Sequence, residues 1–198
     1  IPFKNFLITD PVRQQYPWRE LSIDLLKRGE LPLWNSYSMA GYPLLGNQQS
    51  APFYALNILF LLLPFSFAWS MLILLQPLLA GVFIYLYLRN LRINIYAGLL
   101  GAISFSFCGF FIAWLEWGTI LQVGLWLPLI LLSIDKLVVG SRYKVLNIWS
   151  VVVLLSLSSS LFAGHVQTFF YVFFLTMGYF LARWIQFGKG KNILFLYI

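Results

Sequence analysis

Charged side chains are scarce in this sequence, because 10% of its 198 residues are Asp, Glu, Lys or Arg whereas 61% are hydrophobic. The surface of a soluble globular domain carries far more charge than this. Apolar runs long enough to cross a bilayer recur along the chain without a charge. The composition therefore excludes an ordinary soluble domain and indicates a membrane protein, in agreement with a mean hydropathy of +0.82.

Other absences narrow the chemistry. The one cysteine, Cys108, excludes an intrachain disulfide. The sequence also lacks glycine-rich phosphate loops and the spaced His or Cys pairs of zinc sites, so nucleotide chemistry has no basis in it. Basic residues give a net charge of +7, but they flank the apolar runs and form no patch interleaved with aromatic residues. We expect no nucleic-acid partner.

What charge there is gathers in the first fifty residues, which hold four of the six acids and five of the thirteen bases. Residues 17–28 have the spacing of a short amphipathic helix lying in the membrane interface. Its apolar face comprises Trp18, Leu21, Leu25 and Leu26, and its solvated face comprises Arg19, Glu20, Asp24, Lys27 and Arg28. The apolar segment 51–64 is too short to cross and is predicted as a second interfacial or re-entrant segment. Residues 1–67 are therefore predicted to be one extracytoplasmic loop.

The remainder, residues 68–198, is predicted to be membrane-spanning, so the fold class is all-α, a polytopic transmembrane helix bundle. Spans are expected at 68–88, 95–113, 119–137, 146–163 and 167–184, and another begins near 192. None of them is expected to carry an ionisable residue in its interior. By parity, the basic residues that flank the spans all fall on one side, which predicts that this side is cytoplasmic and that the chain is an integral protein of the cytoplasmic membrane. The chain opens without Met and closes inside an apolar run, so we expect a fragment of a larger protein.

Parity of the spans brings three isolated polar groups, Asp10, Glu116 and His165, to the same extracytoplasmic face. Each also has an ordinary structural interpretation: an acid that opens a turn before a proline, a solvated interfacial acid, and a hydrogen-bonded loop histidine. The juxtaposition of all three makes this face the candidate site.

Polar loop residues add candidates for substrate binding. Trp34, Asn35, Gln48 and Gln49 offer a ring and amides of the kind that bind sugar hydroxyls, although loops are polar in general. The serine-rich run 156–160 is interpreted as a close-packing helix face, since small residues let helices approach.

Several segments of the sequence are distinctive: GELPLWN over 29–35, GYPL over 41–44, QSAPFY over 49–54, LAG over 79–81, WLPL over 126–129 and GHVQ over 164–167. Together they resemble one family, the bacterial YfhO membrane proteins. That family in turn resembles the C-type glycosyltransferases, multispanning enzymes that move a sugar from a polyprenyl-phosphate carrier to an acceptor outside the cytoplasm. The resemblance thus implies a fragment of that larger fold.

The resemblance also implies roles for particular residues. Asp10 matches the catalytic acid of the first extracytoplasmic loop, and Glu116 matches, more loosely, an acid of the second. Arg13 is a candidate for the donor phosphate, or a cation that offsets Asp10. Asp10 and Glu116 are also candidate ligands of a divalent metal, the cofactor being left unknown. The acceptor would be an envelope polymer, lipid or protein. A transporter or flippase of lipid-linked precursors and a non-catalytic envelope assembly protein remain alternatives.

Overall fold

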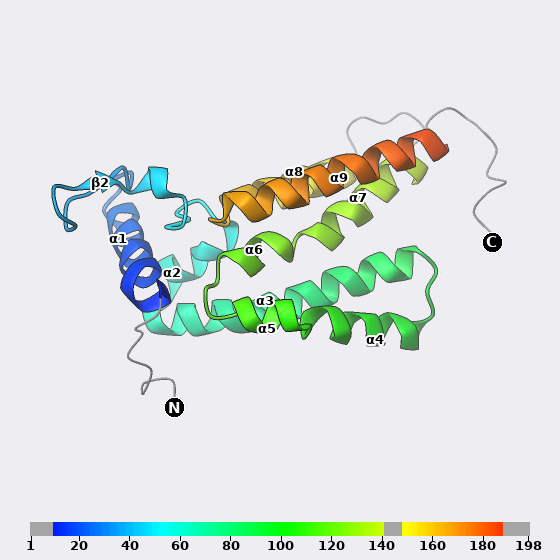
Figure 1. Ribbon diagram of the computed structural model, residues 1–198, viewed down its shortest axis with the longest axis horizontal. Helices are drawn as coiled ribbons and strands as arrows, with labels where there is room; N and C mark the ends of the chain where they lie inside the picture. Colours follow the sequence, from blue (N-terminus) through cyan, green and yellow to red (C-terminus); the bar gives the residue numbers. More distant parts are fainter. Residues whose placement is uncertain (1–9, 141–147, 188–198) are drawn as a thin grey trace.

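The computed structural model describes residues 10–140 and 148–187, and most of them are helical (Figure 1). In chain order the elements are η2 (Pro11–Gln15), α1 (Tyr16–Lys27), β1 (Trp34–Asn35), β2 (Tyr42–Pro43), η3 (Leu45–Asn47), η4 (Ala55–Asn57), α2 (Ile58–Leu62), α3 (Phe65–Asn90), α4 (Ile95–Ser106), α5 (Gly109–Trp114), α6 (Ile120–Gly124), α7 (Leu127–Gly140), α8 (Ile148–Phe162) and α9 (Val166–Phe187). The fold is that of an all-α polytopic membrane protein, as the composition predicts.

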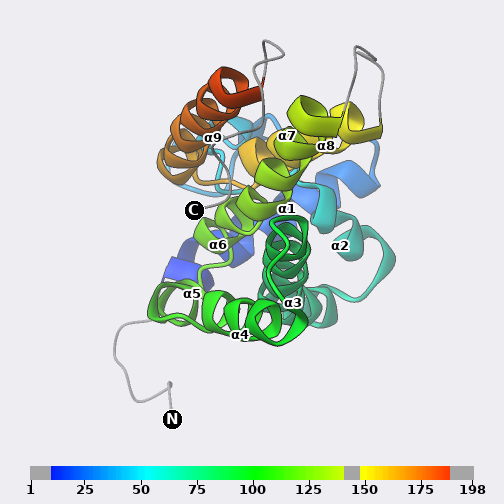
Figure 2. The ribbon, with the colours of Figure 1, turned by 90° about the vertical axis from the view of Figure 1, so that its right-hand side faces the viewer.

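The long helices form two packed groups. Helix α3 pairs with α4, helix α7 packs against both α8 and α9, and the contact of α3 with α7 joins the groups. Figure 2 shows α3 and α4 on one side and α7, α8 and α9 on the other. Helix α1, the β1–β2 hairpin and α2 gather at one end of the long axis, on the left in Figure 1, where α9 also begins. We call this the loop end.

Four helical stretches are long and apolar enough to cross a membrane. They are Phe65–Asn90, Ile95–Trp114, Ile120–Val138 and Val166–Phe187, and they correspond to the first, second, third and fifth expected spans. The expected span 146–163 is represented by α8, whose 15 residues are fewer than the ~20 that a crossing needs. The expected span near 192 lies outside the described residues.

Small residues explain how closely α3 and α4 pack. A Cβ atom added at Gly81 would lie 2.8 Å from the hydroxyl oxygen of Ser106, and one added at Gly101 would lie 2.6 Å from Leu88. Glycine at these positions therefore lets the two backbones approach, as is usual between membrane helices. The serine-rich run of α8 packs in the same way, because Ser156, Ser159 and Ser160 are buried. The hydroxyl of Ser160 donates to the carbonyl of Val123 at 3.1 Å.

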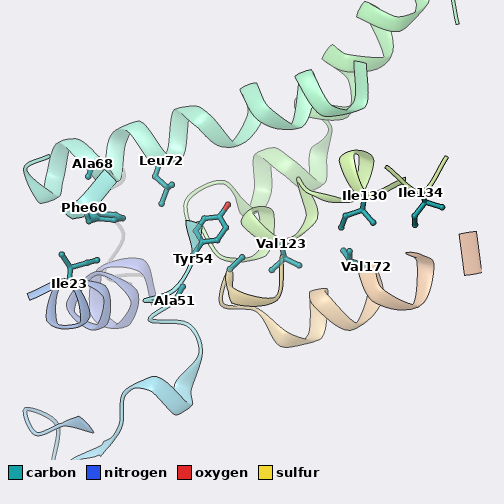
Figure 3. Packing of buried hydrophobic residues seen from close by; sticks show 11 residues of the cluster. Ile23, Ala51, Tyr54, Phe60, Ala68, Leu72, Val123, Ile130, Ile134 and Val172 are labelled. Carbon is teal, nitrogen blue, oxygen red and sulfur yellow. The ribbon is translucent and has the colours of Figure 1, made fainter. Parts of the chain in front are cut away.

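The main apolar core connects the loop end to the spans. It runs from Ile23 of α1 and Phe60 of α2 through Tyr54 to Val123 and Val172 of the second helix group. Figure 3 shows Tyr54 between the residues of α1 and α2 on one side and Val123 on the other. The loop is therefore folded onto the bundle and shares its core.

Segment 51–64 differs from the continuous interfacial segment expected. Only its second half is helical, as the five-residue α2, preceded by the single 3₁₀ turn η4. Asn57 explains the break, because its buried amide donates to the carbonyl of Ala51 and holds a turn that a helix would straighten. Ala51, Tyr54 and Phe60 are buried in the core, whereas Ile58 and Leu62 of the same segment are exposed.

At the end of the molecule opposite the loop end, three spans are tied together by a buried ion pair. The Arg183 guanidinium of α9 donates to both oxygens of Asp135 on α7, from Nε at 2.7 Å and from Nη2 at 3.0 Å. Asp135 also accepts from the hydroxyl of Tyr179 at 2.7 Å and from the amide of Asn90, at the end of α3, at 3.1 Å. Both charges lie near the ends of the candidate spans Ile120–Val138 and Val166–Phe187, so they do not contradict the expectation of span interiors without ionisable residues. The two charges are tolerated because they satisfy each other.

Replacing Asp135 with Asn should destabilise the protein by about 3 kcal/mol, because it leaves the partly buried Arg183 without a counter-ion. Thermal unfolding of the purified protein in detergent measures the loss. Asp24→Asn, an exposed acid on α1, is the matched control and should change little. The double variant Asp135→Asn with Arg183→Gln should recover part of the loss, and a strictly additive result would contradict the clamp.

Candidate functional site

The turn between α8 and α9 lies directly against the first loop. Gly164 has φ +97°, and a Cβ atom built there would lie 3.0 Å from the carbonyl oxygen of Gln48, 3.2 Å from Ala51 and 3.3 Å from Gln49. A side chain would therefore be strained by its backbone and would meet the loop backbone. The structure thus brings together two predicted segments, Gln48–Gln49 and the turn before His165, that are more than a hundred residues apart.

The loop holds its shape through its own hydrogen bonds. The backbone N–H of the buried Ser50 donates to the Asn47 carboxamide oxygen at 3.0 Å, and the Ser50 hydroxyl donates to the carbonyl of Leu44 at 3.1 Å. Gln48 is left exposed and Gln49 half-buried. The amide of Gln48 is therefore presented outward from a fixed backbone.

The β1–β2 hairpin positions Trp34 and Asn35 differently. Asn35 is buried, and its amide donates to the hydroxyl of Tyr42 at 2.9 Å while its carboxamide oxygen accepts from the N–H of Tyr37 at 2.9 Å. Trp34 is 52% exposed, and its indole lies over Gly41, where a Cβ atom would come within 2.4 Å of the ring. The hairpin therefore occupies the amide of Asn35 and leaves the ring of Trp34 accessible.

The two candidate acids are exposed. Asp10 precedes η2 and makes no capping hydrogen bond to it, so a turn-opening role is not visible in its contacts. Arg13 is also exposed and forms no ion pair with Asp10 in the part of the chain that the structure describes. Glu116 is exposed between Trp114 and Trp117, whose rings are 5.1 Å apart. In Figure 1 the start of η2, the α5–α6 turn and the start of α9 all lie at the loop end.

His165 is half-buried and caps the start of α9. Its Nδ1 accepts from the backbone N–H of Thr168 at 3.2 Å and lies 2.7 Å from the Thr168 hydroxyl. Burial lowers the pKa of His165 below its usual value of 6.5. The imidazole is therefore neutral at pH 7, and with Nδ1 as acceptor its proton is on Nε2.

A hollow of about 270 Å³ opens beside Gln48, between the loop and the C-terminal end of α8. It is lined by Leu45, Gln48, Ala51, Pro52, Phe53, Leu161 and Phe162. This volume is near the lower limit for small-ligand sites, and apolar walls with one amide suit a hydrocarbon chain next to a polar group.

Arg19 is buried and does not lie on the solvated face of the amphipathic helix. It was expected on the solvated face of the amphipathic helix, but it is 1% exposed, with its guanidinium 5.0 Å from the ring centre of Trp69 and 5.7 Å from that of Phe60. Burial lowers the pKa of Arg19 to about 10, so it stays charged at neutral pH. The aromatic residues at 60, 65 and 69 give a sequence signal for a buried cation, but only once α1 is known to pack on them.

Metal ligation has little support at this end. No group of three or more His, Cys, Asp or Glu side chains that could hold a metal ion occurs within residues 10–140 and 148–187. In this part of the chain Asp10 and Glu116 are therefore not joined by a third ligand of these types.

Comparison with known proteins gives one match. The model of a family described as "Bacterial membrane protein YfhO" matches residues 37–197. No curated protein and no solved structure matches the chain. The matched stretch contains the loop at Gln48, Glu116, the turn at Gly164 and all four candidate spans, whereas Asp10 and Arg19 precede it.

Gly164→Ala should destabilise the protein by about 1–3 kcal/mol, because alanine is strained at φ +97° and its Cβ meets the carbonyl of Gln48. The same exchange at Gly178 in α9, where nothing lies within 4 Å, is the matched control and should be neutral or stabilising. Thermal unfolding of both variants measures the difference. If the two variants had the same unfolding temperature, the turn at Gly164 would not contact the loop at Gln48.

The protein should lose stability in acid through His165. The pKa of His165 in the folded protein lies below 6.5, so as the pH falls the unfolded state takes up the proton before the folded state does. The stabilisation that the neutral His165 gives is therefore complete above pH 6.5 and is lost as the pH falls through the lowered pKa. His165→Asn keeps an N-terminal cap but does not titrate, so its unfolding midpoint should fall less between pH 7.5 and 5. If the unfolding midpoints of wild type and His165→Asn fell by the same amount over this pH range, His165 would not have this role.

Proposed function

The chain belongs to the YfhO family of bacterial membrane proteins, and we propose that it transfers a sugar from a polyprenyl-phosphate donor to an acceptor outside the cytoplasm. The loop end is the proposed site and faces the extracytoplasmic side of the cytoplasmic membrane. The observation that carries the proposal is the packing of Gly164 on Gln48 and Gln49, because it fixes two separate polar segments into one surface.

Asp10 is the proposed catalytic base. In the transfer, the acceptor hydroxyl oxygen bonds to the anomeric carbon of the sugar, and the bond from that carbon to the phosphate oxygen breaks with its electron pair going to the phosphate. The hydroxyl proton passes to the Asp10 carboxylate, which is exposed and free of a capping bond. Glu116 and Arg13 are the proposed groups that position the donor.

The sugar and its acceptor are proposed to bind along the loop. The accessible ring of Trp34 offers a stacking face, and the exposed amide of Gln48 and the half-buried Gln49 offer hydrogen bonds. His165 presents an Nε2–H donor near the same loop. The apolar hollow beside Gln48 would accept part of a hydrocarbon chain next to these groups.

One observation favours a second function, transport of a lipid-linked precursor. Asp135 and Arg183 lie within candidate spans, and intramembrane charges frequently mark a transport path. The carboxylate of Asp135 is, however, fully engaged by Arg183, Tyr179 and Asn90. This saturation is typical of a structural clamp, so transfer remains the preferred proposal.

Asp10→Asn in the full-length protein should reduce sugar transfer by about two to four orders of magnitude, because asparagine fills the same space but cannot accept the proton. Transfer from a polyprenyl-phosphate sugar is measured in membranes with equal amounts of each protein. The matched control is Asp24→Asn, an exposed acid one helix further along. Transfer by Asp10→Asn at the rate of that control would falsify the assignment.

A further inference from the structure

The Arg19 guanidinium is a buried cation with unused hydrogen-bond donors. Its Nε and Nη2 atoms are buried and have no hydrogen-bond partner among the described residues. Trp69 and Phe60 lie against it, and their ring faces attract the charge but accept no hydrogen bond of ordinary strength. A buried charge without a counter-ion is strongly unfavourable, so this arrangement calls for an anion.

The chain supplies no carboxylate for this position. All six of its acids lie in described residues, and five of them are exposed: Asp10, Glu20, Asp24, Glu30 and Glu116. The sixth, Asp135, pairs with Arg183. In the part of the chain that the structure describes, Arg19 therefore makes no ion pair.

Other unpartnered polar groups surround Arg19. Arg19 and Ser22 are buried on α1, and Gln15 is buried at the end of η2, directly before α1. The side-chain oxygens of Gln15 and Ser22 have no hydrogen-bond partner among the described residues. Tyr54 is also buried near Arg19, and burial raises the pKa of its hydroxyl, which is therefore neutral and able to donate a hydrogen bond. Beyond it, Trp126 lies near the Tyr54 hydroxyl, although the two do not reach hydrogen-bond geometry. Buried polar atoms without hydrogen-bond partners in this number usually indicate an absent ligand or water.

We propose that Arg19 binds the phosphate group of a lipid, with the hydroxyls of Ser22 and Tyr54 donating to the same oxyanion. The free Nε and Nη2 donors form the planar fork that binds a tetrahedral oxyanion in bidentate fashion. This inference rests on the proposed function for the identity of the lipid, a polyprenyl phosphate.

The surface next to Arg19 favours a lipid over free phosphate. Phe60, whose ring lies under the guanidinium, is buried, whereas three other side chains of α2 are exposed, those of Ile58, Leu61 and Leu62. Ile58 is 55% exposed and Leu62 is 72% exposed. An exposed apolar surface that leads to a buried cation matches a hydrocarbon tail that ends in a phosphate.

Binding to the purified full-length protein in detergent tests the proposal. The probes are polyprenyl phosphate, the neutral polyprenol of the same chain length, and inorganic phosphate. Wild type should bind polyprenyl phosphate at least tenfold more tightly than polyprenol, and Arg19→Gln should reduce the affinity for polyprenyl phosphate about tenfold or more. Arg28→Gln, an exposed arginine at the end of the same helix, is the matched control and should bind as wild type does.

Ser22→Asp provides a second variant in case Arg19→Gln fails to fold. It places a carboxylate three residues from Arg19 on the same buried face of α1, so the protein itself then supplies the counter-ion that Arg19 lacks. It should raise the unfolding temperature of the ligand-free protein and abolish the stabilisation by polyprenyl phosphate. Retention of wild-type affinity by Ser22→Asp or Arg19→Gln would overturn the proposal.

The remaining outcomes separate the ligand from the function. Inorganic phosphate that binds as tightly as the lipid would overturn the lipid assignment and make the ligand free phosphate. Equal binding of polyprenol and polyprenyl phosphate would overturn the anion site itself. Arg19-dependent binding without any sugar transfer would uphold this inference and reject the proposed function, because the binding assay needs no turnover.

Discussion

The structure depends on one constraint: a charge or hydrogen-bonding group buried among apolar helices must be satisfied. Two arginines differ in whether the described residues satisfy them. Arg183 is saturated by Asp135 and Tyr179, and it ties α7 to α9. Arg19 lies between aromatic rings with its donors unused in the part of the chain that the structure describes. The first arrangement is a clamp that needs nothing further, and the second calls for a ligand.

This difference divides the molecule into two ends with different tasks. The end with Asp135 is closed by internal ion pairing and by contact of three spans. The loop end combines exposed acids, an accessible indole, outward amides and a small apolar hollow on a backbone fixed by the Gly164 contact. Rigid helices that position a polar loop are a common way to build a site that binds one amphipathic substrate.

Much of the fold could be predicted from the sequence, because long apolar runs dictate spanning helices directly. The α1 helix and the close-packed serines of α8 are also confirmed, since both follow from local periodicity and residue size. The break in segment 51–64 could not be predicted, because it depends on the amide of Asn57 meeting the carbonyl of Ala51 in a particular turn.

The charges were harder to place. At ~100° per residue Arg19 falls on the same side of α1 as Ile23 and Leu26, so the spacing itself places it away from the solvated face. The spacing says nothing, however, of the aromatic residues of α2 and α3 that cover the guanidinium. In the same way, Asp135 and Arg183 are 48 positions apart, so their pairing follows from the packing of α7 on α9 and not from spacing along the chain. The segments that carry the candidate residues, the start of η2, the α5–α6 turn and the start of α9, lie at the loop end in Figure 1, and the roles of Asp10, Glu116 and His165 stay predictions.

The most direct test is an experimental structure of the full-length protein with polyprenyl phosphate bound. The account predicts phosphate density within hydrogen-bond reach of the Arg19 guanidinium, at the same end as Gln48 and Gly164. A lipid head group bound at the Asp135 end, or a carboxylate from elsewhere in the protein occupying the place of the phosphate at Arg19, would contradict it.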